Sequence, residues 1–222
     1  MDQLLKLPPL NVDFRMMGWA FPLPIVVSIL MALFHYAIHG GSENLIPIEA
    51  IRYGLGFFSV PFISVWAIHL YQNLVNPEEK EVLLSLPYQP FSFGLLRLLR
   101  ITLIYLIFFW SVQIFLYSHS REGAAVLDWV FPVVLIFYFS SLSYFIVLAV
   151  KNVLIGYALL GIYIVFEYTT RGGFSGPFYA FQWVNPKPTL ESGYNLLALI
   201  LLTLAFLLIA QWILTNRDLL SR

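Results

Sequence analysis

The chain has 222 residues, of which 60% are hydrophobic and only 11% are charged, a composition that predicts a membrane protein rather than a soluble domain. Lys and Arg total 12, as do Asp and Glu, so no charge excess indicates nucleic acid or an acidic substrate as a partner. Cysteine is absent, which excludes disulfides, thiolate metal sites and cysteine nucleophiles.

Six apolar segments are long enough to cross a bilayer as helices, because one crossing needs about 20 residues. The fourth and fifth are separated only by Lys151 and Asn152, which predicts a tight turn. The sequence therefore predicts an all-α membrane protein with one transmembrane domain over residues 1–222, and with its N-terminal segment retained. The expected crossings are Gly18–His39, Tyr53–Val75, Leu95–Tyr117, Trp129–Val150, Val153–Tyr168 and Tyr194–Ile213.

The distribution of basic residues predicts the orientation, because cytoplasmic loops carry the excess of Lys and Arg. With the N-terminus inside, 8 of the 12 basic residues fall on the inner side and 4 on the outer side. We therefore expect both termini in the cytoplasm and a multi-pass protein of the cell (plasma) membrane. The inner set is Lys6, Arg15, Lys80, Arg97, Arg100, Lys151, Arg217 and Arg222, and the outer set is Arg52, Arg121, Arg171 and Lys187.

The outer loops differ in character. The loops "HGGSENLIPIEAIR" and "SHSREGAAVLD" are short and polar, which is typical of solvated connections. Residues 169–193 instead have Gly and Pro at both ends and "FYAFQWV" between them. Such a segment is expected either to re-enter the outer leaflet, which is tolerated where protein buries the backbone, or to lie flat as an interfacial aromatic belt.

The inner loop "NPEEKEVLLSLPYQP" predicts a short, locally specified helix. Asn76 is a good N-cap, Pro77 suits the first helical position, and Glu79 completes a capping box. Pro87 ends the helix after Leu86. A helix of about ten residues needs packing partners for stability in water, which are its own crossings, the lipid interface or another protein.

The same run resembles the first cytoplasmic loop of ATP-binding-cassette (ABC) exporter permeases of the type-2 class. In that family a glutamate precedes a leucine-rich run ending in "LLslP", and a basic residue opens the next crossing. The resemblance extends to the six crossings and to the N-terminal "MDQLLKLPPLNVDFRMMGWAF", which is similar to the family's connecting helix. The matching residues are Glu81, Leu83, Leu84, Ser85, Leu86, Pro87 and Arg97.

The resemblance implies that this loop is a coupling helix that docks on an ATPase subunit. The implied function is a permease subunit of an ATP-driven exporter of a hydrophobic or amphipathic cargo (peptide, lipid or drug-like). ATP and Mg²⁺ would bind a partner dimer of ABC ATPase subunits, since the chain has no phosphate-binding loop. A second permease copy or a sister permease would complete the path. The coupling residues expected are Glu78, Glu79, Glu81, Val82, Leu83, Leu84 and Leu86.

Other charged residues near the crossings are also candidates. Arg97 and Arg100 are three residues apart on one helical face, and we expect them to reach inner lipid headgroups or an acidic partner. Glu167 and Arg171, at the outer end of the fifth crossing, form a candidate ion-paired outer gate. His35 and His39 have metal-ligand spacing, but no cysteine or nearby carboxylate completes a metal site.

Two alternatives to transport follow from the same sequence. The first is a membrane scaffold, for which the inner loop is only a docking site. The second is an intramembrane enzyme that uses His69 or the serines Ser140, Ser141 and Ser143. No catalytic motif of a hydrolase or metalloprotease accompanies these residues. We expect His69, with Gln72 and Asn73, to hydrogen-bond neighbouring helices instead.

Overall fold

The computed structural model describes residues 9–39, 46–76, 89–120 and 122–216, and these ranges form helices joined by turns. The elements are α1 (Leu10–Met17), η1 (Gly18–Ala20), α2 (Pro22–His39), α3 (Ile48–Tyr53), η2 (Gly54–Ser59), η3 (Val60–Phe62), α4 (Ile63–Leu70), α5 (Gln72–Val75), η4 (Ser92–Leu96), α7 (Arg97–Ser118), α8 (Val126–Val150), α9 (Val153–Thr170), η5 (Gly176–Phe178) and α10 (Ser192–Thr215). Within the described ranges the β-pairing is limited to an isolated bridge between Ile46 and Ser120.

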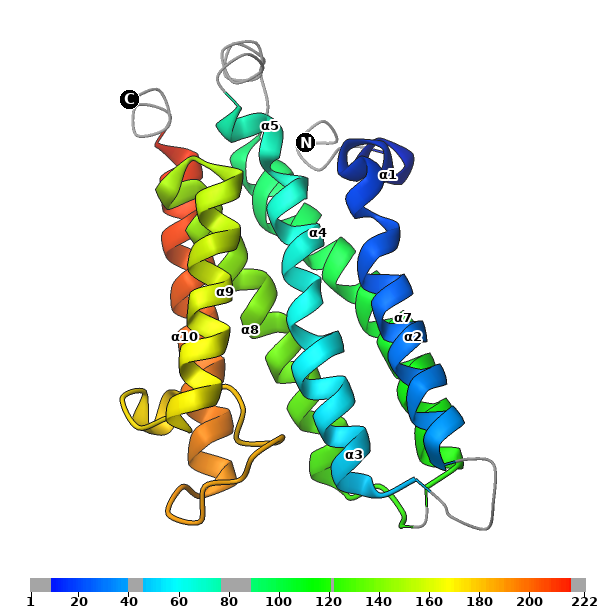
Figure 1. Cartoon of the computed structure of the whole chain (residues 1–222). Helices are drawn as coiled ribbons and strands as arrows, with labels where there is room; N and C mark the ends of the chain where they lie inside the picture. Colours follow the sequence, from blue (N-terminus) through cyan, green and yellow to red (C-terminus); the bar gives the residue numbers. More distant parts are fainter. Residues whose placement is uncertain (1–8, 40–45, 77–88, 121, 217–222) are drawn as a thin grey trace.

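The long helices run side by side between two ends of one bundle (Figure 1). We call the end that contains α1, α5 and the α8–α9 turn the α1 end, and the opposite end, which contains α3, the α3 end. The N-terminal helix and the last turn of α10 lie at the same end, as an even number of crossings requires.

Five helical stretches are long and apolar enough to cross a membrane, and the bent pair α1–α2 makes a sixth. The five are Ile48–Leu70, Ser92–Ser118, Val126–Val150, Val153–Thr170 and Ser192–Thr215. These match five of the crossings expected from the sequence, with ends shifted by a few residues. The all-helical architecture with five or six candidate crossings is therefore confirmed, whereas the side of the membrane on which each end lies stays a prediction.

The first crossing starts later than the sequence indicates, at Pro22, because the chain bends by 65° between residues 10–20 and 22–38. Gly18 makes this bend possible, since its φ of 52° with ψ of −128° is readily adopted only by glycine. Pro22 and Pro24 then lie in the first turn of α2, where a missing N–H costs no helical hydrogen bond. As a result α1 lies at an angle to α2 at the α1 end of the bundle and does not extend α2 (Figure 1).

The second and third crossings each contain a π-helical turn, η2 and η4. Tyr105 of α7 donates to the carbonyl of Ser59 at the end of η2, at 2.6 Å. Tyr71, where α4 ends, donates to the carbonyl of Gly94 in η4 at 2.7 Å. The carbonyls that a widened turn leaves open are thus satisfied by tyrosine hydroxyls of neighbouring helices.

Helix α8 is the central element of the bundle and packs along both α4 and α10. Its last turn leads directly into α9 through Lys151, in the left-handed conformation at φ 55°, and Asn152. Asn152 caps α9 by accepting from the N–H of Ile155 at 3.1 Å. The tight turn predicted between these two crossings is therefore confirmed.

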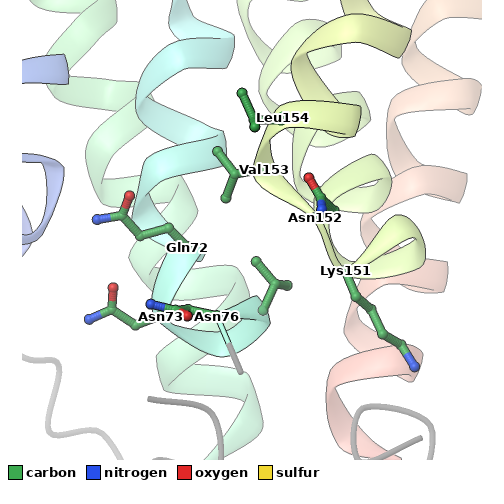
Figure 2. A pocket seen from close by; sticks show the side chains of 8 residues that line it. Gln72, Asn73, Asn76, Lys151, Asn152, Val153 and Leu154 are labelled. Carbon is green, nitrogen blue, oxygen red and sulfur yellow. The ribbon is translucent and has the colours of Figure 1, made fainter. Parts of the chain in front are cut away.

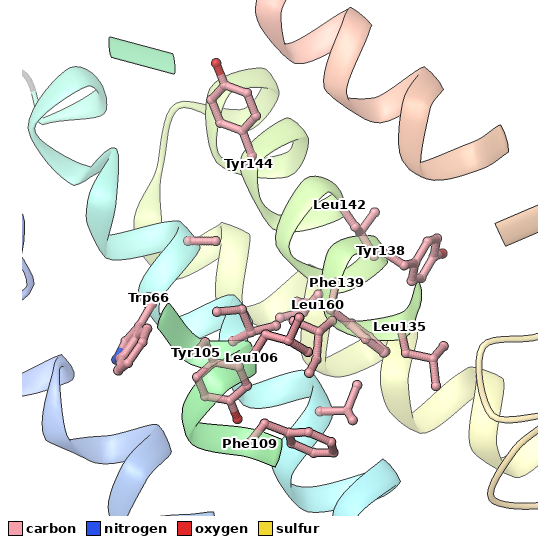
Figure 3. Packing of buried hydrophobic residues seen from close by; sticks show 14 of the residues in the cluster. Trp66, Tyr105, Leu106, Phe109, Leu135, Tyr138, Phe139, Leu142, Tyr144 and Leu160 are labelled. Atoms are coloured by element: carbon pink, nitrogen blue, oxygen red, sulfur yellow. The ribbon is translucent and has the colours of Figure 1, made fainter. Parts of the chain in front are cut away.

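The apolar core lies where α4, α7, α8 and α9 meet, and it is rich in aromatic side chains. Figure 3 shows Trp66, Tyr105, Phe109, Phe139 and Leu160 converging from these four helices. The indole nitrogen of the buried Trp66 has a partner, because Nε1 donates to the carbonyl of Phe21 at 2.8 Å. The core thus fixes the positions of the helices that frame the site described below.

Candidate functional site

The predicted ATPase-coupling residues come between α5 and η4 in the sequence, and α5 lies at the α1 end. Their flanks are described: Asn76 follows α5, and Ser92 begins η4. The coupling assignment therefore stays a prediction. The residues Glu78, Glu79, Glu81, Val82, Leu83, Leu84 and Leu86 lie outside the described residues.

A polar pocket of about 450 Å³ lies beside these flanks. One wall is the end of the second crossing, with Gln72, Asn73, Val75 and Asn76, and the other is the turn into α9, residues 151–154 (Figure 2). The end of the second crossing, which leads into one predicted inner connection, is therefore a neighbour of the α8–α9 turn. A protein docking on one of them would also meet the other.

Arg97 and Arg100 contact a carboxylate of their own chain, Asp13 on α1. Arg97 donates from Nε to Oδ1 of Asp13 at 2.5 Å, and Arg100 donates from Nη2 to Oδ2. The side chains of Asp13 and Arg97 are 0% exposed, and that of Arg100 is 22% exposed. Arg97 is thus part of a buried ion cluster, so neither predicted partner, a lipid headgroup or an acidic protein, accounts for its position.

The same cluster attaches α1 to the bundle. The guanidinium of Arg97 also lies 4.8 Å above the ring centroid of Phe93 and donates to the sulfur of Met16. Gln72 donates to the carbonyl of Met16 at 2.6 Å, which joins α1 to α5 and confirms the expected helix-bridging role of Gln72. These contacts place α1 against the first turns of α7, directly after the predicted coupling loop.

An apolar groove runs between the second crossing and α9, and we call it the α4–α9 groove. Its volume is about 340 Å³. Gly161 contributes no side chain, and nothing lies within 4 Å of a Cβ built there, so this wall is open. The lining residues are Phe57, Phe58, Pro61, Phe62, Ser64, Val65, Tyr157, Leu160, Gly161 and Ile164. The groove suits an apolar or amphipathic molecule.

Toward the α1 end, Tyr157 and His69 bound the groove. The Tyr157 hydroxyl and Nδ1 of His69 are 2.5 Å apart, and both groups also contact the carbonyl of Val65, at 3.3 and 3.1 Å. The rings of Trp19 and His69 are nearly perpendicular, with a centroid distance of 5.6 Å. His69 therefore links two helices, as expected.

Toward the α3 end, four aromatic rings meet, and we call Tyr53, Phe57, Tyr168 and Phe181 the aromatic closure. Phe57 lines the groove, and its ring centroid is 4.8 Å from Tyr168, 5.8 Å from Tyr53 and 5.8 Å from Phe181. Tyr168 and Phe181 complete the set at 5.9 Å. The groove therefore ends at this cluster.

Phe181 belongs to residues 169–193, for which two arrangements were predicted, and lies in the segment 171–191 between α9 and α10. Tyr179, Phe181 and Trp183 are at most 4% exposed, so these three rings are buried in the protein, whereas Phe178 of the same run is 41% exposed. Burial raises the pKa of the Tyr179 hydroxyl to about 12, so it stays protonated at neutral pH. The depth of the segment in the membrane stays a prediction.

Side chains of α10 and of the segment itself fix the path of this segment. Asn195 of α10 donates from Nδ2 to the carbonyls of Pro177 and Tyr179 at 2.8 and 2.9 Å. Gln182 closes a turn by accepting from the N–H of Lys187 and donating to the carbonyl of Leu190. These bonds satisfy backbone groups that would otherwise be buried without partners.

Asp128 is the main polar centre at the α3 end. Arg52 donates from Nε to Oδ1 at 2.6 Å and from Nη2 to Oδ2 at 3.0 Å. Trp183 donates to Oδ1 at 2.9 Å, and the N–H of Ala125 donates to Oδ2 at 2.9 Å. The backbone carbonyl of Asp128 accepts from Gln113 at 2.7 Å. Asp128 is the last residue of the loop "SHSREGAAVLD", which was predicted to be only a solvated connection. That prediction is wrong at Asp128, which is buried as an ion-pair partner.

Glu167 and Arg171, the predicted outer gate, lie at the same end but do not pair with each other. Glu167 is buried and accepts from the Ser175 hydroxyl at 3.0 Å. Arg171 is exposed and ends α9 in the left-handed conformation at φ 48°. Within the described ranges the ion pairs are those of Arg52 with Asp128 and of Arg97 and Arg100 with Asp13.

Two of the serines named for an intramembrane enzyme have structural partners, whereas the hydroxyl of Ser143 is buried and has no hydrogen-bond partner in the described part of the chain. Ser140 and Ser141 donate to the carbonyls of Phe137 and Tyr138 in their own helix, at 3.0 and 2.9 Å. Such bonds to the preceding turn are common for buried helical serines. Among the described residues no three His, Asp or Glu side chains are grouped as metal ligands.

Comparison of the chain with protein-family models, curated proteins and solved structures gives no match.

Proposed function

We propose that this chain is the membrane-spanning permease subunit of an ATP-driven ABC exporter. The α4–α9 groove carries the proposal: it is apolar, bounded at both ends by side chains, and framed by two helices of a multi-pass bundle. The cargo proposed is a hydrophobic or amphipathic molecule, such as a peptide, lipid or drug-like compound. Both termini are proposed to be cytoplasmic, in the cell membrane.

The driving force would come from a separate pair of ATPase subunits bound at the α1 end. The predicted coupling loop begins after Asn76 and leads into α7, and the polar pocket extends this face to the α8–α9 turn (Figure 2). Because Asp13 joins Arg97 to α1, a push on the loop would act on α1 and α7 together. This arrangement supports transmission of motion from a soluble motor to the crossings.

A second permease copy or a sister permease is proposed to complete the path. In the single chain only 17% of the most apolar 18-residue stretch of α9 is buried, and 22% of the corresponding stretch of α10. Lipid or another permease must cover these surfaces in the membrane.

The first test is purification of the full chain from its native membrane in mild detergent. An associated soluble chain with a phosphate-binding loop is expected. Replacing Val82, Leu83 and Leu86 together by Ala should remove that chain from the complex and abolish transport. The matched control is the Ala replacement of Leu30, Leu33 and Phe34, three exposed apolar residues of α2. Retention of the ATPase and of transport by the loop variant would refute the coupling assignment.

The scaffold alternative predicts a different outcome in the same preparation. A permease complex reconstituted in vesicles should hydrolyse ATP faster when cargo is present, whereas a scaffold should bind the ATPase without this response. Replacing Phe62 and Leu160 by Ala, both in the groove wall, should change the cargo response without releasing the ATPase. An unchanged response would contradict the assignment of the groove.

A further inference from the structure

The aromatic closure consists of two halves that come from different parts of the chain. Tyr53 and Phe57 belong to the second crossing, at the α3–η2 junction. Phe181 belongs to the segment 171–191, and Tyr168 to the last turns of α9. Opening the α4–α9 groove toward the α3 end would require the Phe181 side to move away from the Phe57 side.

Asp128 binds both halves at once. Through Oδ1 and Oδ2 it pairs with Arg52, the residue directly before Tyr53, and through Oδ1 it also accepts from Trp183, two residues after Phe181. The carboxylate is 0% exposed, so no water competes for its oxygens in the closed arrangement. One carboxylate on α8 therefore connects the second crossing to the segment that closes the groove.

The packing around this link is close. A Cβ at Gly56 would lie 2.2 Å from Cγ2 of Val184 and 3.1 Å from the Trp183 ring, so the segment rests directly on the backbone of η2. The ring of Phe181 also packs on Phe139 of α8 at a centroid distance of 6.2 Å. The segment is thus a fitted part of the bundle, and its polar attachment to the second crossing runs through Asp128.

We propose that Asp128, acting through Arg52 and Trp183, is the positioning residue that keeps the aromatic closure in place and the groove shut toward the α3 end. Access from that end opens when the bond between Trp183 and Asp128 is released. The link to cargo release rests on the proposed function, but the closure itself does not.

The absence of cysteine in the chain allows a direct test by thiol labelling. Ser64→Cys places a thiol of similar size in the groove wall at a buried position. A charged, membrane-impermeant maleimide is added to intact cells, because it reaches only thiols that contact outside water. Gly123→Cys, in the exposed loop at the α3 end, establishes that this end is reached.

Trp183→Phe keeps a ring but removes the N–H donated to Asp128. A hydrogen bond to a charged group is strong enough that its loss shifts an open–closed equilibrium about tenfold, so labelling of Ser64→Cys should accelerate about tenfold. Arg52→Gln should accelerate it as well, and Arg52→Lys should restore slow labelling because the ion pair can re-form. Trp129→Phe, beside Asp128 on α8, is the matched control and should leave the rate unchanged.

Equal labelling rates in the Trp183→Phe and Trp129→Phe backgrounds would overturn the proposal. So would a Gln-like rate for Arg52→Lys, since that result would indicate general loosening of the α3 end. The Trp183→Phe variant leaves the Arg52–Asp128 ion pair in place, and Trp129→Phe makes the same loss of ring volume at a position that does not bind Asp128. The labelling uses neither cargo nor ATPase, so a failure of the transport proposal would leave its outcome interpretable.

Discussion

Replacement of Asp13 by Asn gives the sharpest stability prediction. The carboxylate accepts from Arg97 at 2.5 Å and from Arg100, and both Asp13 and Arg97 are fully buried. Asn keeps the size of the side chain but leaves the guanidinium of Arg97 buried without a compensating charge. Breaking a buried pair in this way is destabilising by about 3–5 kcal/mol.

The loss should be visible as a lower thermal midpoint of the full chain in mild detergent, followed by the fraction that stays monodisperse after heating. For a domain of this size, about 2–4 °C per kcal/mol corresponds to a decrease of about 6–20 °C. Arg100→Gln should cause a smaller decrease, because that side chain is 22% exposed and part of its charge already meets solvent.

Two further variants separate the charge effect from the packing effect. Asp13→Leu combined with Arg97→Met should recover most of the stability, since apolar replacement of a whole buried pair is often neutral. Arg15→Gln, an exposed position on the same helix, should change the free energy of unfolding by about 0.5 kcal/mol or less. If Asp13→Asn behaves like Arg15→Gln, the ion cluster does not fix α1, and the argument for coupled movement of α1 and α7 fails.

The remaining predictions concern two glycines and one hydrogen bond, and all are measured by the same thermal assay. Gly94→Ala should destabilise the protein by about 1–3 kcal/mol, because a Cβ there would lie 2.4 Å from the Tyr144 hydroxyl. Gly161→Ala should stabilise α9 by about 0.5–1 kcal/mol, because its Cβ meets open space and Ala favours helix; a loss of stability would contradict the open groove wall. Tyr157→Phe should cost about 0.5–1.5 kcal/mol by removing the hydrogen bond to His69, and no change would indicate that the bond contributes nothing.

The crossings could be predicted from the sequence because the bilayer leaves the backbone little choice. An apolar run of this length must satisfy its own N–H and C=O groups, and a helix does so within the segment. The turn at Lys151–Asn152 could be predicted for the same reason, since only two residues separate two apolar runs. The bend at Gly18 was missed, although the glycine and the two following prolines lie at the predicted start of the first crossing.

The contacts between distant residues could not be predicted in this way. Asp13 lies 84 positions from Arg97, and Asp128 lies 76 from Arg52 and 55 from Trp183. Nothing local indicates these pairs, because each acid belongs to a stretch that is polar or amphipathic on its own. A weak signal existed: a buried acid near a crossing needs a cation, and the predicted crossings offer few.

The π-helical turn at Gly54–Ser59 sets the angular phase of the second crossing. One surplus residue in a helix rotates everything beyond it by about 100° relative to an uninterrupted α-helix. On one side of this turn Arg52 faces Asp128, and on the other His69 faces Tyr157. A one-residue deletion within the turn would bring one of these contacts out of alignment with the other, so the count of residues there, as much as their chemistry, decides which side chains line the groove.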